Sequence, residues 1–154
     1  MKVTVGWKGR TRFEGTNENN DTKVVMDTAD PDLGGDNGGP TPKQVFLQSI
    51  AGCTGVDVVH ILGKMRATMP ERFAMQVSAV AAETDPKVFT SIELVYDVRG
   101  GTEREKLVRA VKLSQETYCS VSIMVSRMCP IGYTVLLNGE TIADGRGGGF
   151  SRLS

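Results

Sequence analysis

Sulfur is the side-chain chemistry that this sequence offers most plainly. The chain has three cysteines, Cys53, Cys119 and Cys129, which are too few and too far apart for a disulfide-stapled scaffold. They contain no Cys-x-x-Cys pair, so a zinc site of that type is excluded. His60 is the single histidine, and a Cys–His or Ser–His mechanism would have to use it. If this protein catalyses a reaction, we expect a cysteine to carry it.

Cys53 lies eleven residues after Pro42, in the middle of a predicted apolar helix. Free cysteine is among the most buried residue types, so Cys53 is either a packing residue or a nucleophile. The positive end of a helix acts only within its first turn and cannot activate a thiol at this depth. A nucleophilic Cys53 therefore needs a cation from elsewhere in the fold.

Two metal-binding interpretations are weak. Cys53, Asp57 and His60 share one face of the predicted helix and could hold a metal or form a relay, but the chain has no other histidine to complete the site. The two polar side chains could equally lie at a dimer contact. An EF-hand loop beginning at Asp30 fails because its twelfth position, Thr41, is not a glutamate. We expect no bound metal and no cofactor.

The elements that must position these residues can be predicted from hydrophobic periodicity. Alternation of apolar and polar residues predicts strands, which we expect to pair in antiparallel order through short turns. The predicted strands are residues 2–8, 11–14, 22–27, 73–83, 88–98, 133–137 and 140–143. Segment 28–41 is rich in glycine, proline and aspartate and is expected to be a loop.

Two helices are predicted. A capping box at Thr41 and Gln44, with Pro42 at the first helical position, begins a helix that runs to about Ala67. Its apolar residues cover most of its circumference, so we expect it to be buried on all sides. A second, amphipathic helix is predicted over residues 102–119, followed by an irregular stretch before the last hairpin.

Length and composition limit the class of protein. The chain is 40% apolar, and we expect a single α+β domain over residues 1–154 with a loose tail at about residues 145–154. Eighteen basic residues balance eighteen acidic residues, which argues against nucleic-acid binding. We expect neither a membrane span nor a secretory signal, and therefore a cytoplasmic protein.

The run of residues 39–59 resembles the hallmark helix of the OsmC/Ohr family, the osmotically inducible and organic hydroperoxide resistance proteins. The resemblance covers about residues 2–138. The features that carry it are the Thr41-Pro42 start, the Gly52-Cys53 pair, Asp27 with the Gly34-Gly35 loop, and the segment Glu116–Ser122. It implies an OsmC-like fold in which antiparallel sheets pack on a long buried central helix. It also implies an intertwined homodimer with active sites at the interface.

In that family the helix cysteine attacks a hydroperoxide and a later cysteine resolves the intermediate. The resemblance therefore implies that Cys53 attacks and Cys119 resolves, in a peroxidase that reduces organic hydroperoxides and is recycled by a dithiol reductant. It also implies an activating arginine from the turn after the first strand, where Lys8, Arg10 and Arg12 are candidates. A planar guanidinium can hold both a thiolate and a peroxide oxygen, which disfavours the lysine, and we expect Arg10 first.

One departure from the family pattern keeps a second function open. Lys43 stands where Ohr-type proteins have the glutamate that orients this arginine, and the run after Cys53 is closer to an OsmC-like subgroup. The alternative is a non-enzymatic dimeric stress or small-ligand-binding protein that has lost the catalytic relay. In the enzyme, oxidation is expected to link Cys53 to Cys119 and leave Cys129 free. A Cys119–Cys129 bridge is the alternative.

Overall fold

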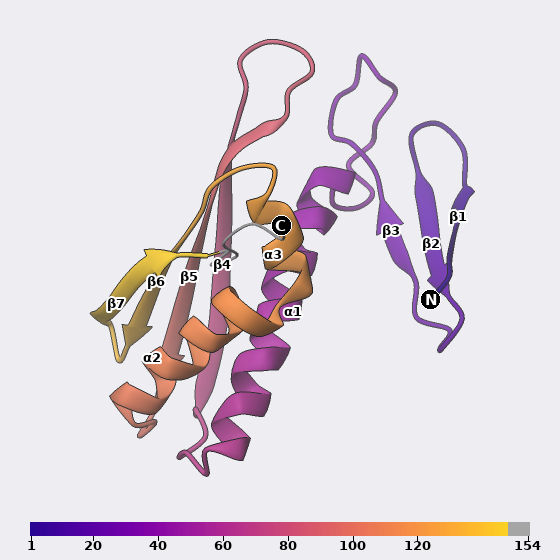
Figure 1. Ribbon diagram of the computed structural model, residues 1–154. Helices are drawn as coiled ribbons and strands as arrows, with labels where there is room; N and C mark the ends of the chain where they lie inside the picture. Colours follow the sequence, from indigo (N-terminus) through magenta and orange to yellow (C-terminus); the bar gives the residue numbers. More distant parts are fainter. Residues whose placement is uncertain (148–154) are drawn as a thin grey trace, which may run out of the picture. The chain divides into compact units, whose positions relative to one another are not determined.

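A three-stranded antiparallel sheet and the loop after it form the first part of the chain. The structure is a computed structural model that describes residues 1–147 and divides into two units, residues 1–47 and 48–154. Three strands are present in the first unit, as predicted, and they pair in sequence order (Figure 1), but the second covers residues 13–17 rather than the predicted 11–14. They are β1 (Val3–Trp7), β2 (Phe13–Asn17) and β3 (Val24–Met26). The single domain over residues 1–154 stays a prediction.

The apolar face of β1 is exposed. Val3, Val5 and Trp7 alternate along the strand, as the period of two predicts, and are 68%, 52% and 67% exposed. Phe13 lies opposite Trp7 on β2 and is 41% exposed. We expected one face of this strand to be buried, and this expectation is wrong for the single chain. A row of large apolar side chains on β1 is exposed instead.

A buried carboxylate organises the loop that follows β3. Asp27 is 2% exposed and accepts hydrogen bonds from Thr11 Oγ1 at 2.6 Å and from two backbone amides at 2.8 and 2.9 Å. These bonds, that of Thr11 foremost, hold the pKa of Asp27 far below its ordinary range. Arg12 Nη2 lies 2.8 Å from Asp36 Oδ1 and 3.8 Å from Asp27 Oδ2. The predicted loop at 28–41 is confirmed, and the Arg12 guanidinium lies between Asp36 in this loop and Asp27 just before it.

The second unit contains a four-stranded mixed sheet with its helices on one face (Figure 1). The outer pairs are antiparallel, but the two central strands run parallel. The prediction of a purely antiparallel sheet is wrong at that pair, because a helical crossover of about thirty residues between the strands allows parallel pairing. The strands are β4 (Arg72–Ala81), β5 (Phe89–Arg99), β6 (Ile131–Leu137) and β7 (Glu140–Arg146).

The end of the chain differs slightly from expectation. Strand β7 extends through Arg146, so residues 145 and 146 of the predicted loose tail are strand. Gly147 follows the strand and its amide donates to Ile131 O at 2.8 Å, and residues 148–154 of the predicted tail lie outside the described residues.

The crossover is more regular than the sequence predicts. Helix α2 (Arg104–Leu113) passes into a π-helix, η1 (Ser114–Tyr118), and a further helix, α3 (Ser120–Ser126), replaces the expected irregular stretch. Cys119 separates the last two with an extended backbone, φ −68° and ψ 95°, and its amide donates to Ser114 O at 2.8 Å. A π turn takes in an extra residue, which hydrophobic periodicity does not reveal.

The long helix α1 (Pro42–Lys64) begins as predicted and ends three residues before Ala67. Its capping box is confirmed: Thr41 N donates to Gln44 Oε1 at 2.8 Å, and Gln44 N donates to Thr41 Oγ1 at 3.2 Å. Burial on all sides is wrong for the single chain, because one face remains open. The buried residues are Ile50, Thr54, Val58, Ile61 and Leu62.

By length and composition alone, α1 could also cross a membrane. Asp57 is the one charged residue between Lys43 and Lys64, and the expectation that the chain has no membrane span stays a prediction. Core helices of soluble proteins can have the same length and composition; in α1, Ile50 and Leu62 are fully buried, whereas most of the helix is not.

A buried hydrogen-bond network ties α1 to the sheet and to the π-helix. Thr54 Oγ1 lies 2.7 Å from Tyr96 Oη and 2.7 Å from Ser114 Oγ. Gln115 Nε2 donates to Tyr96 Oη at 2.6 Å and to Thr54 Oγ1 at 3.1 Å. All four side chains are fully buried. Because they have left water, their hydrogen bonds to one another hold α1, β5 and η1 in register.

We expect Thr54→Val to lower the free energy of unfolding by about 2 kcal/mol, because it leaves three buried partners short of a hydrogen bond while keeping the side-chain shape. Urea denaturation at a fixed protein concentration measures this. The matched control is Thr134→Val on β6, whose hydroxyl makes no hydrogen bond within residues 1–147, and we expect it to change stability by less than about 0.5 kcal/mol. Equal effects of the two variants would contradict the role given to the network.

Candidate functional site

Two cysteines and one carboxylate come together in the second unit. Cys53 and Asp57 lie four residues apart and therefore on one face of α1. Cys119 joins them from the N-cap of α3. The two Sγ atoms and a carboxylate oxygen of Asp57 all lie within 4.8 Å of one another. Two thiols that the chain separates by 66 residues are thus neighbours.

The two thiols have different surroundings. Cys119 is fully buried, whereas Cys53 is half-buried. Burial raises the pKa of Cys119 to about 11, and the backbone amide of Ser122 donates to its Sγ at 3.4 Å. Cys119 is therefore a protonated thiol near neutral pH. The cluster therefore contains one half-buried cysteine and a second that is fully buried and protonated.

Asp57 connects this cluster to the buried network. Ser114 Oγ donates to Asp57 Oδ2 at 3.2 Å, and the same hydroxyl is hydrogen-bonded to Thr54. The carboxylate is half-buried. The network therefore fixes the position of Asp57 relative to both sulfur atoms.

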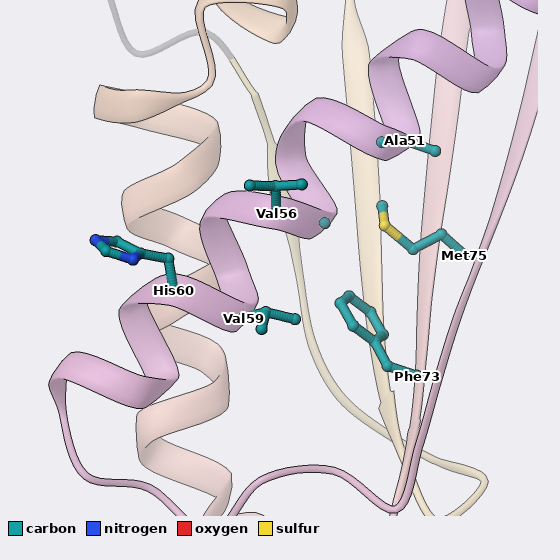
Figure 2. Close-up of a pocket in the computed structure, with 8 residues that line it drawn as sticks. Ala51, Val56, Val59, His60, Phe73 and Met75 are labelled. Atoms are coloured by element: carbon teal, nitrogen blue, oxygen red, sulfur yellow. The ribbon is translucent and has the colours of Figure 1, made fainter. Parts of the chain in front are cut away.

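His60 is not part of the cluster. Of the predicted group of Cys53, Asp57 and His60, only Cys53 and Asp57 belong to the cluster. Cys119 is its third member. The imidazole is exposed and points away from β4 (Figure 2). It lies instead at the edge of an apolar hollow.

That hollow lies between α1 and β4 and has a volume of about 630 Å³ (Figure 2). Phe73 and Met75 point into it from the strand, while Gly52 and Gly55 leave the helix backbone as its opposite wall. The lining is mostly apolar, and Cys53 is not among the residues that form it. The lining residues are Ala51, Gly52, Gly55, Val56, Val59, His60, Phe73 and Met75.

The candidate cations lie in the first unit. Arg10 is exposed in the turn between β1 and β2 with φ at +50°, and its carbonyl oxygen accepts from Trp7 Nε1 at 2.8 Å. Lys8 Nζ lies 3.5 Å from Glu14, and Arg12 is held by Asp36 as described above. Both cysteines lie in the second unit, so Arg10 stays a predicted partner of Cys53.

Cys129 is buried, with 6% exposure, and lies outside the three-residue cluster. Its amide donates to Val125 O at 3.1 Å at the end of α3. Sequence reasoning missed the network residues Ser114 and Gln115. The sequence did contain a signal for them. Ser114 and Gln115 are polar residues at positions of the predicted amphipathic helix that belong to its apolar, inward-facing side.

Known proteins are similar to this chain in sequence and in fold. Protein YhfA of Escherichia coli strain K12 is 31% identical to the chain over 135 residues, which are 87% of this chain and 96% of YhfA. The crystal structure of a hypothetical protein from Aquifex aeolicus VF5 has a TM-score of 0.76 and 28% identity, covering 89% of this chain and 95% of that one.

More distant structures have the same fold. The organic hydroperoxide resistance protein OhrB of Bacillus subtilis has a TM-score of 0.59 at 22% identity, covering 89% of this chain and 96% of OhrB. The family model described as OsmC-like protein matches residues 35–134, which include α1, both cysteines of the cluster and the crossover. The chain therefore belongs to the OsmC/Ohr family of OsmC-like proteins.

Proposed function

We propose that this protein is a thiol-dependent peroxidase that reduces organic hydroperoxides. The observation that supports it most is the pairing of a half-buried Cys53 with a fully buried Cys119, their sulfur atoms within 4.8 Å. Membership of a family that includes organic hydroperoxide resistance proteins points the same way. The apolar residues around Cys53 on α1 suit a substrate with an apolar organic group.

In the proposed cycle the Cys53 thiolate attacks the terminal oxygen of the hydroperoxide. The O–O bond breaks, the alcohol leaves after taking a proton, and Cys53 becomes a sulfenic acid. The Cys119 sulfur then attacks the Cys53 sulfur, water leaves, and a disulfide forms. A dithiol reductant restores both thiols, which suits a reducing compartment such as the cytoplasm.

The geometry leaves room for this closure. A disulfide needs its sulfur atoms about 2.05 Å apart, so the two must approach from a separation of at most 4.8 Å. Cys119 has an extended backbone between two helices and is not locked inside either one. Its side chain can therefore turn toward α1 without unwinding a helical residue.

We expect the wild type to consume cumene hydroperoxide in the presence of a dithiol reductant, and Cys53→Ser to reduce the rate at least a hundredfold because it removes the attacking sulfur. Cys129→Ser is the matched control and should keep the rate. After one equivalent of hydroperoxide, peptide mapping should recover Cys53 linked to Cys119. A Cys119–Cys129 bridge, with Cys53 still open to alkylation, would show that Cys53 is a packing residue.

The alternative function is a non-enzymatic dimeric stress or small-ligand-binding protein. Lys43 in place of the family glutamate favours it, and so does an apolar hollow of about 630 Å³ that does not include Cys53. The same assay separates the two functions. A hydroperoxide rate that is equal in the wild type and in Cys53→Ser would support the binding protein.

For the activating cation we propose Arg10, with Arg12 as the alternative. A fixed positive charge raises the thiolate fraction of a nearby cysteine, so its removal should slow alkylation of Cys53 by iodoacetamide at pH 7 about tenfold. We compare Arg10→Ala with Arg12→Ala, and Lys8→Ala tests the third candidate from the same turn. If neither arginine variant changes the rate, the mechanism lacks its main electrostatic element.

We also propose that the protein is an obligate homodimer. Two apolar faces are uncovered in the single chain: Val56 and Val59 on α1 are 71% and 42% exposed, and Val3 and Trp7 on β1 are 68% and 67% exposed. Exposed apolar surface of this extent marks an association surface. A second copy would also give α1 the all-round burial that its composition predicts.

Light scattering should give about twice 16.6 kDa at micromolar concentration. Val56→Glu should shift the protein toward monomer because it places a charge in the buried contact. Val88→Glu is the matched control: Val88 is 57% exposed, lies outside both faces and should leave the dimer intact. A stable, folded wild-type monomer would contradict the proposal.

A further inference from the structure

We propose that in the reduced protein Cys53, Asp57 and Cys119 bind one zinc-class divalent cation. This inference goes beyond the peroxidase and does not rest on it, because binding needs only the two reduced thiols and the carboxylate. It replaces the ligand set considered from the sequence, since Cys119 rather than His60 completes the cluster.

The ligand types select the class of metal. Two thiolates and one carboxylate suit a borderline-soft ion such as Zn²⁺, whereas Mg²⁺ prefers oxygen ligands alone. Three protein ligands leave a fourth tetrahedral position for water or an external thiol, as in open zinc sites. The cluster therefore fits an exchangeable zinc site.

The spacing is close to what zinc requires. Bonds of about 2.3 Å from zinc to sulfur place two sulfur ligands about 3.8 Å apart in a tetrahedral site. The three ligand atoms lie within 4.8 Å of one another, so the two sulfur atoms need to approach by at most about 1 Å. Two of the three ligands, Cys53 and Asp57, are half-buried, whereas Cys119 is fully buried.

Two buried serines hold the ligands in place. Ser114 Oγ donates to Asp57 Oδ2 at 3.2 Å, and Ser122 N donates to Cys119 Sγ at 3.4 Å. Both serines are fully buried. Such outer contacts orient metal ligands. Within residues 1–147, Asp57 makes no ion pair, so a bound cation would supply its missing counter-charge.

The chemistry links metal binding to the redox state. Binding replaces the protons of the two thiols, so up to two protons are released for each zinc ion bound. When a hydroperoxide oxidises the zinc-bound pair, the two sulfurs give up two electrons and form a disulfide. The peroxide takes these electrons with two protons and becomes alcohol and water, and zinc is released. The metal thus competes with hydroperoxide for Cys53.

The test is an anaerobic titration of the reduced protein with Co²⁺ and Zn²⁺. We expect one Co²⁺ per chain with a thiolate-to-cobalt charge-transfer band, displacement by Zn²⁺, and no competition by Mg²⁺. Cys53→Ser and Cys119→Ser should lose the band, and Asp57→Asn should weaken binding at least tenfold. His60→Ala and Cys129→Ser are matched controls and should bind like the wild type.

Wild-type protein oxidised with diamide provides a test without a substitution, and it should bind no cobalt. Circular dichroism checks that each variant is folded. The proposal is overturned if the reduced wild type binds no stoichiometric cobalt, if the oxidised form binds it equally, or if His60→Ala or Cys129→Ser abolishes binding. Because no hydroperoxide is present in the titration, a failed peroxidase assay would leave this result unchanged.

Discussion

The constraint on which the second unit depends is that its buried polar side chains must find partners among themselves. Thr54, Tyr96, Ser114 and Gln115 come from a helix, a strand and a π-helix, and all four are fully buried. Away from water each lost hydrogen bond is costly, so the three elements can meet in few arrangements. That requirement, more than apolar packing alone, sets the register between α1 and the crossover.

The cluster of Cys53, Asp57 and Cys119 is a consequence of that register. Ser114 reaches both Thr54 and Asp57, so the network that anchors η1 also places the carboxylate beside Cys53. The π turn then delivers Cys119, with an extended backbone, to the same point. The two proposals made above, dithiol redox chemistry and metal binding, both rest on this close arrangement, and each requires the two sulfurs to be reduced at the start.

A second feature of the single chain is the exposed apolar surface on two of its elements, β1 and α1. Apolar side chains on β1 and on the open face of α1 have no cover in the single chain, although their periodicity is that of buried elements. The loop of residues 28–41 is nevertheless well organised, because Asp27 collects hydrogen bonds from Thr11 and from backbone amides. The first unit is therefore ordered by polar contacts within itself, while its apolar side chains on β1 remain exposed.

Local signals in the sequence determined a large part of this protein. The capping box at Thr41 and the period-two strands are short-range features, and the run around Cys53 identified the family. Tertiary structure alone decided the parallel pairing of β5 with β6, the π turn before Cys119, and the replacement of His60 by Cys119 in the cluster. The physical reason is distance along the chain. Thr54 and Ser114 are 60 residues apart, and no local pattern shows that two such hydroxyls share a hydrogen bond.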